Sequence, residues 1–135
     1  MNPTWGVSDY EMREKQNNLK DILEDAVARG DYEAALLSDS DGLNLAAVGT
    51  GAFTGMMAAI VSLLRESAQS TREQLDLAHV NELSLVGDDR FRLVCRFFEA
   101  DDGQSFILTV IVPPDQAYRR ITNRAIKRIQ EVWSE

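Results

Sequence analysis

The feature that most constrains this sequence is a stretch without ionisable side chains that runs from Leu43 to Leu64. Charged residues make up 27% of the chain, so an uncharged run of this length must be shielded from water. Gly49, Thr50 and Gly51 interrupt it, and glycine favours the interior of neither a strand nor a helix. A membrane span needs about 20 consecutive apolar residues. The stretch therefore predicts a short strand followed by a helix.

The length and the cysteine content indicate a single domain that needs no covalent staple. A chain of 135 residues can bury roughly two thirds of its unfolded surface. Its single cysteine, Cys95, cannot form an internal disulfide. The N-terminus shows no charged leader followed by an apolar stretch, so we expect a cytoplasmic protein. We expect a flexible tail over residues 1–8 and one domain over residues 9–134.

The charge balance argues against nucleic acid as a partner. The formal net charge is −8, with 22 acidic against 14 basic residues, which repels phosphate backbones at long range. Basic residues do gather near the C-terminus, at Arg119, Arg120, Arg124, Lys127 and Arg128. Their spacing fits the solvated face of a helix.

The first third of the chain predicts a helix and a β-hairpin. Ser8 and Glu11 have the spacing of a capping box, so a helix should begin near Asp9, and Gly30 should end it as a C-cap glycine. Its apolar face is predicted at Met12, Leu19, Ile22, Leu23, Ala26 and Val27. Strands at 33–38 and 43–48 follow, joined by the tight turn of residues 39–42. Because the first strand is apolar on both faces, it should be covered by layers on both sides of the sheet.

The second helix, predicted over residues 53–71, has an apolar surface too wide for one contact. One stripe consists of Phe53, Met57, Ile60 and Leu64, and a second stripe beside it of Met56, Ala59 and Leu63. The polar side is left to Ala58, Ser62, Arg65 and Gln69. Either the whole helix is sunk in its own core, or the first stripe packs on the sheet and the second on a partner subunit. We favour the partner interpretation.

The last half predicts three strands and a helix. Segments 80–86, 90–100 and 104–112 are separated by Gly-Asp-Asp and Asp-Asp-Gly turns that suit hairpins. The last strand is apolar on both faces and belongs in the middle of the sheet, whereas the shorter, more polar 80–86 suits an edge. A final helix should start near Pro114 and Asp115. The predicted fold is α/β (α+β), in the order α-β-β-α-β-β-β-α, with a single five-stranded antiparallel sheet and helices on both faces.

The candidate catalytic and metal-binding motifs are all incomplete. Cys95 and His79 could pair as nucleophile and base, but no third group orients them. The turn Asp39-Ser40-Asp41-Gly42 resembles the start of a calcium loop and lacks the closing glutamate. Gly49-Thr50-Gly51 lacks the lysine of a phosphate-binding loop. The sequence therefore predicts no enzyme, no cofactor and no metal.

Taken together, these segments resemble the Roadblock/LC7 family. The resemblance covers residues 9–134, and its most specific part is the hairpin Ser-Asp-Ser-Asp-Gly-Leu, residues 38–43, followed by the apolar helix, three strands and a last helix. The size and simplicity of the chain are most similar to bacterial, MglB-like members that partner Ras-like GTPases. The resemblance implies a Roadblock/LC7 (profilin-like) fold and a dimer in which the second helix and the third strand pair with their counterparts.

The residues expected at the dimer or partner interface are Met56, Ala59, Leu63, Ser67, Glu82 and Ser84. The resemblance further implies a non-enzymatic module that regulates a small Ras-like GTPase, as a homodimer or with a paralogous Roadblock protein. One alternative is a structural scaffold subunit that binds other Roadblock or longin-type domains. Another is a small-molecule sensor, which would need an internal apolar cavity with a few polar groups.

Overall fold

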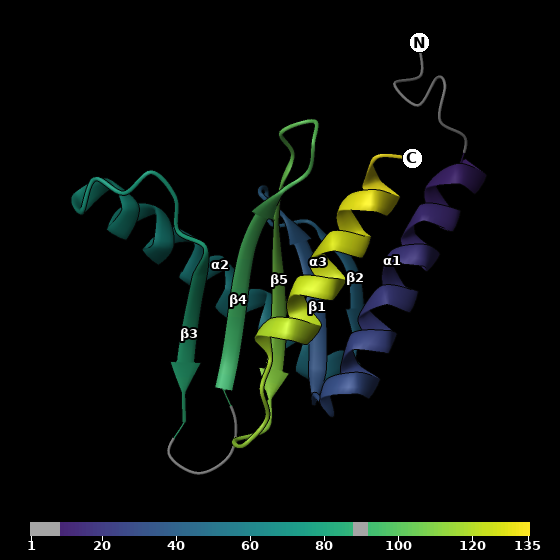
Figure 1. Cartoon of the computed structure of the whole chain (residues 1–135), viewed down its shortest axis with the longest axis horizontal. Helices are drawn as coiled ribbons and strands as arrows, with labels where there is room; N and C mark the ends of the chain where they lie inside the picture. The colour runs from purple at the N-terminus through teal and green to yellow at the C-terminus, as the bar shows by residue number, and fades with distance from the viewer. Residues whose placement is uncertain (1–8, 88–91) are drawn as a thin grey trace.

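The structure is a computed structural model that describes residues 9–87 and 92–135. In this part of the chain one antiparallel sheet of five strands has the order β2-β1-β5-β4-β3. Figure 1 shows α1 and α3 side by side on one face and α2 on the other. The predicted element order and fold class are confirmed. The elements are α1 (Asp9–Gly30), β1 (Ala34–Asp39), β2 (Asn44–Val48), α2 (Gly51–Gln74), β3 (Glu82–Val86), β4 (Arg92–Glu99), β5 (Ser105–Val112) and α3 (Arg119–Trp133).

The centre of the sheet is the pair β1 and β5, because both strands are apolar on both faces. Ala35 lies opposite Val110 and Leu37 opposite Leu108 in their antiparallel register. Every residue from 106 to 112 is buried, as a strand covered on both sides must be. The predicted central position of β5 and the predicted edge position of β3 are therefore confirmed.

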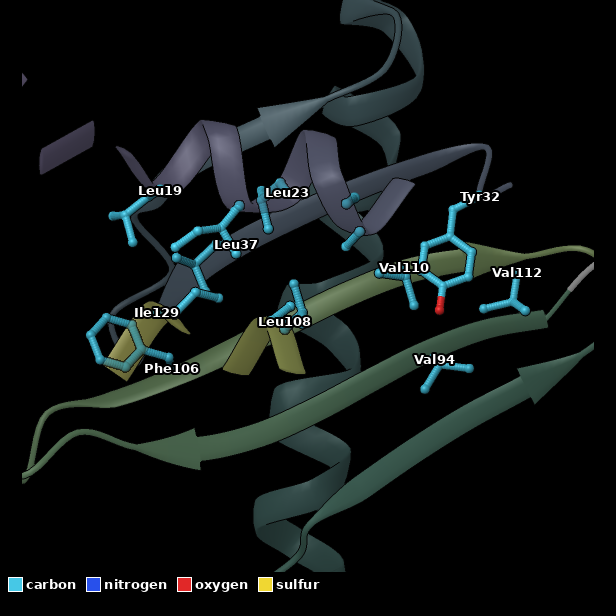
Figure 2. Close-up of a cluster of buried hydrophobic side chains, with 14 of the residues drawn as sticks. Leu19, Leu23, Tyr32, Leu37, Val94, Phe106, Leu108, Val110, Val112 and Ile129 are labelled. Atoms are coloured by element: carbon cyan, nitrogen blue, oxygen red, sulfur yellow. The ribbon is translucent and has the colours of Figure 1, made fainter. Parts of the chain in front are cut away.

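Two hydrophobic clusters form, one on each face of the sheet. The larger joins α1 and α3 to side chains such as Leu37, Phe106 and Leu108, and Figure 2 shows these side chains gathered between the helices and the strands. The smaller joins α2, through Met57 and Val61, to the opposite face. Successive side chains of β4 point to opposite faces of the sheet, so Val94 belongs to the larger cluster and Cys95 to the smaller one.

Three helix boundaries differ from the sequence prediction, namely the start of the last helix and both ends of the second, which runs on to Gln74 and does not end at residue 71. The last helix begins at Arg119 and not near Asp115, because residues 113–116 form a turn in which the Gln116 N–H donates to the Pro113 carbonyl at 3.2 Å. Arg92 donates to the Gln116 carbonyl at 2.5 Å and keeps that oxygen out of a helical ladder. The second helix starts earlier, at Gly51, where the Thr50 hydroxyl accepts the Phe53 N–H and caps the helix.

The helix α1 ends at Gly30 as predicted, but the backbone conformation that ends it differs from the predicted C-cap glycine. The left-handed backbone conformation belongs to Asp31, with φ 54°, and not to Gly30. Gly30 is needed for a different reason, since a Cβ there would overlap the ring of Tyr32. Met12, predicted on the apolar face, is exposed, because α1 enters the core only from Leu19 onward. The predicted cap residue Ser8 lies outside the described residues.

Tyr32 belongs to the larger cluster, and its hydroxyl is a polar group buried among apolar side chains. The hydroxyl points between Val110 and Val112 in Figure 2 and has no hydrogen-bond partner among the described residues. Burial raises the pKa of Tyr32 to about 12, although the Arg92 guanidinium opposes the shift. The folded state thus favours the neutral phenol. This contribution to stability is complete below the ordinary pKa of 10.0 and is lost as the pH rises toward 12.

We therefore expect Tyr32→Phe to raise the free energy of unfolding at pH 7 by about 1 kcal/mol, since it removes an unpaired buried polar group. The variant should also lose less stability than the wild type between pH 10 and 12. Urea unfolding over this pH range measures both effects. Tyr10→Phe, at an exposed tyrosine of α1, is the matched control and should follow the wild type. A variant less stable than the wild type at pH 7 would contradict the prediction.

Candidate interaction surface

The two apolar stripes predicted for α2 occupy different environments. Met57 is fully buried, and Phe53, Ile60 and Leu64 pack around it against the sheet. On the second stripe Met56 is 53% exposed and Leu63 is 66% exposed, and Ala59 and Ser67 are also exposed. The helix is therefore not sunk in its own core. Its second stripe leaves large apolar side chains in contact with solvent.

Two positions of α2 lie on the sheet side although the stripe pattern does not predict them there. Val61, which belongs to neither predicted stripe, is buried one turn after Met57. Ala58, predicted on the polar side, packs partly against the same cluster. The spacing of four residues between Met57 and Val61 was the available signal for Val61.

The edge strand β3 is the second element for which the sequence predicts an interface. It pairs with β4 alone in the described part of the chain, so its outer N–H and C=O groups are unpaired in the sheet. Ser84, Leu85 and Val86 are exposed. Figure 1 shows the C-terminal part of α2 running past β3, at the left of the view. The described part of the chain thus has an exposed apolar stripe on α2 and an open strand edge on β3.

Glu82 differs from the other predicted interface residues because its side chain is engaged within the chain. The Tyr118 hydroxyl donates to Glu82 Oε2 at 2.5 Å. Arg119 Nη1 lies 3.3 Å and Arg96 Nε 3.6 Å from Glu82 Oε1, and only 17% of the Glu82 side chain is exposed. Its carboxylate therefore joins β3 to β4 and to the start of α3. A role for Glu82 at an interface remains a prediction.

Tyr118 lies between two arginines at this junction. The guanidinium carbons of Arg92 and Arg119 lie 5.1 and 5.5 Å from its ring centroid, within the range of cation–π contacts. The hydrogen bond to Glu82 raises the pKa of Tyr118, because the bond is lost when the phenol ionises. Helical periodicity predicts Tyr118 on the buried face of the last helix and does not reveal this cluster, since its members come from three elements.

We expect Glu82→Gln to lower the free energy of unfolding by about 1–3 kcal/mol, because two arginines lose their charged partner. The pKa of Tyr118 should fall toward its ordinary value, since the acceptor is no longer charged. Urea unfolding and an ultraviolet titration of tyrosine measure the two effects. Arg120→Gln, at an exposed position of α3 where no carboxylate lies within ion-pair distance among the described residues, is the control and should change stability by less than about 0.5 kcal/mol. An unchanged tyrosine titration would contradict the assignment.

The candidate catalytic and metal motifs have structural roles in this arrangement. Cys95 is buried, burial raises the pKa of its thiol, and the Thr109 hydroxyl donates to its sulfur at 3.5 Å. His79 is exposed in the segment before β3. Asp39 Oδ1 accepts the N–H groups of Asp41 and Leu43 at 2.9 Å, which is turn chemistry. In residues 9–87 and 92–135 no group of three or more His, Cys, Asp or Glu side chains could hold a metal ion.

Two hollows open onto the surface. One, of about 870 Å³, lies between the C-terminal half of α2 and the ends of β4 and β5, and Arg72, His79 and Phe97 are among the residues that line it. The other, of about 630 Å³, lies between α3 and the strands β3 and β4. Both are open grooves rather than the enclosed apolar cavity that a small-molecule sensor would need. No helix in the described part of the chain is long and apolar enough to cross a membrane.

Comparison with known proteins identifies the architecture. The sequence matches no protein-family model, and no curated protein matches it. Among solved structures, MglB of Myxococcus xanthus superposes with a TM-score of 0.73 at 11% identity, over 90% of this chain and 91% of that one. An MglB with a tetrameric arrangement gives 0.72 at 19% identity, over 87% and 89%. A Roadblock/LC7 domain from Streptomyces avermitilis gives 0.69 at 20% identity, over 85% and 94%. With its element order and sheet order, this chain has the Roadblock/LC7 fold.

Proposed function

We propose that the protein is a non-enzymatic, homodimeric module that binds and regulates a small Ras-like GTPase in the cytoplasm. The observation that carries the proposal is the exposed stripe of Met56, Ala59 and Leu63, and the open edge of β3 is a second surface that supports it. Two copies related by a twofold axis would place the same stripe and the same edge against each other, as an isologous contact requires. Joining the β3 edges would extend the sheet across both copies.

One of the similar structures supports self-association. An MglB in a tetrameric arrangement demonstrates that a chain of this fold assembles with copies of itself. The chemistry of the described residues supports a binding role, since the one cysteine is buried and its thiol has a raised pKa. In this proposal the GTPase holds the nucleotide, and this protein regulates the GTPase by binding to its surface.

The first test is the oligomeric state of the full chain. Sedimentation-equilibrium ultracentrifugation at tens of micromolar should give the mass of a dimer, twice 15.1 kDa. A monomer at this concentration would overturn the proposal. A stable complex formed only with a paralogous Roadblock protein would replace the homodimer with a heterodimer.

The second test separates regulation from scaffolding. Purified Ras-like GTPases of the same genome, beginning with any encoded beside this gene, are loaded with GDP or with a non-hydrolysable GTP analogue. A regulator should prefer one nucleotide state, because a partner shifts an equilibrium only by its differential affinity for the two states. Single-turnover assays of hydrolysis and exchange then identify the regulated step. Equal binding in both states would favour the scaffold subunit.

A further inference from the structure

Half of the basic residues of this acidic protein gather on two adjacent elements. The net charge is −8, yet seven of the 14 lysines and arginines belong to β4 and α3, namely Arg92, Arg96, Arg119, Arg120, Arg124, Lys127 and Arg128. Some are neutralised within the fold, since Asp25 of α1 lies 3.2 Å from Arg128 and 3.8 Å from Arg124. Among the described residues no carboxylate lies within ion-pair distance of Arg120 or Lys127.

Three donor side chains on α3 form one wall of the 630 Å³ groove. Arg119, Asn123 and Lys127 recur every four residues and so lie along one side of the helix. Arg96 donates to Asn123 Oδ1 at 2.8 Å, which leaves the Asn123 amide nitrogen as a donor. The wall thus presents an ammonium, an amide N–H and a guanidinium, and it favours a ligand rich in acceptors.

The rest of the groove adds an apolar surface. Phe98 of β4 and Ile126 of α3 line it, and both are only partly buried. Glu82 is the acidic residue of the lining, and Tyr118, Arg96 and Arg119 already neutralise and bond it. An anion entering the groove therefore meets the unpaired ammonium of Lys127 and the apolar side chains of Phe98 and Ile126, and the one carboxylate of the lining is already paired with arginines.

We propose that this groove binds a short acidic segment of another protein, with an apolar side chain of that segment against Phe98 and Ile126. Lys127, which has no ion-pair partner among the described residues, and the exposed side chain of Arg119 suit a short acidic chain. Large polyanionic surfaces, such as an anionic membrane, are disfavoured because the rest of the molecule repels them at long range. The site lies on the α3 face of the sheet, opposite α2, and its wall on α3 is part of each single copy.

The test uses the full chain and a fluorescein-labelled peptide of acidic residues around a central Phe-Leu pair. Fluorescence anisotropy at about 0.15 M salt should give saturable binding, weakened as salt rises. A second peptide replaces Phe-Leu with Gly-Ser and should bind several-fold more weakly, since it loses the apolar contact. Vesicles of phosphatidylcholine and phosphatidylserine serve as the membrane probe and should not bind.

Two charge reversals on the same helix locate the site. Lys127→Glu removes a cation of the groove, and we expect about a tenfold loss of affinity for the peptide. Arg120→Glu makes the same change in net charge at an exposed position outside the groove lining, and should cost less than about twofold. Both residues are exposed, so thermal melting of the variants should match the wild type.

Equal losses in the two variants would overturn the proposal, because they would indicate attraction by overall charge. No saturable binding, indifference to the Phe-Leu pair, or preferential binding of the vesicles would overturn it as well. The peptide assay measures binding at the groove beside α3. A negative result there would not change the expected outcome of the ultracentrifugation or of the GTPase assays.

Discussion

Leu63→Glu is expected to convert the proposed dimer into a monomer. Leu63 is 66% exposed in the isolated chain, more than Met56, the other large apolar side chain of the stripe proposed to contact the second copy. A carboxylate buried there without a partner would cost several kcal/mol, of the order measured for unpaired buried charges. The dissociation constant should therefore rise at least about a hundredfold. Analytical ultracentrifugation over a dilution series measures this change.

The matched control is Ser62→Glu, which places the same charge on the adjacent residue. Ser62 is exposed, and its hydroxyl bonds only the Ala58 carbonyl of its own helix. One residue is a rotation of about 100° around the helix, so position 62 points away from the stripe. Ser62→Glu should remain dimeric, and circular dichroism should show both variants folded. Dissociation of both variants, or of neither, would contradict the proposed interface.

Phe106→Ala is expected to cause the largest loss of folding stability. Phe106 of β5 is 1% exposed, its ring centroid lies 5.4 Å from that of Phe98 in a stacked pair, and it lies 5.0 Å from Trp133 of α3 edge to face. Truncation removes these contacts and leaves a cavity between the central strand and the last helix. We expect the free energy of unfolding to fall by about 3–5 kcal/mol.

Urea unfolding at one fixed protein concentration measures this loss, because association would otherwise contribute to apparent stability. Phe106→Leu keeps most of the buried volume and should cost less than half as much as the alanine variant. Phe53→Ala is a second comparison, since Phe53 is only partly buried at the rim of the smaller cluster. A loss at Phe106 no greater than that at Phe53 would contradict the central role of the aromatic contacts.

Much of the fold could be predicted because the sequence encodes it locally. The double-faced apolar strands at 34–39 and 105–112 required layers above and below, and the Asp-Asp-Gly turn of residues 101–103 separates β4 from β5. The other expected turn, at residues 87–89, lies mostly outside the described residues. The two stripes of the second helix could be separated by angle, and their different exposure agrees with that division. Helix ends were predicted less well, since the start of α3 depends on a contact between Arg92 and Gln116, 24 residues apart.

The candidate surfaces divide in the same way. Apolar residues at helical spacing are sufficient to predict the stripe of Met56, Ala59 and Leu63 from the sequence. The groove beside α3 could not be predicted, because its wall and floor come from β3, β4 and α3. Likewise, the sequence placed Glu82 on an open edge, whereas a hydrogen bond to Tyr118, 36 residues later, turns its carboxylate inward.

The uncharged run from Leu43 to Leu64 by itself determined that this protein has a hairpin strand, a glycine break and a helix with surplus apolar surface. Periodicity and turn chemistry are properties of neighbouring residues, so they can be read from the chain alone. Only the tertiary structure decided which stripe the sheet covers and which cations remain without partners. Both outcomes depend on which side chains that are distant in sequence come into contact. Packing and charge pairing in the folded chain determine those contacts.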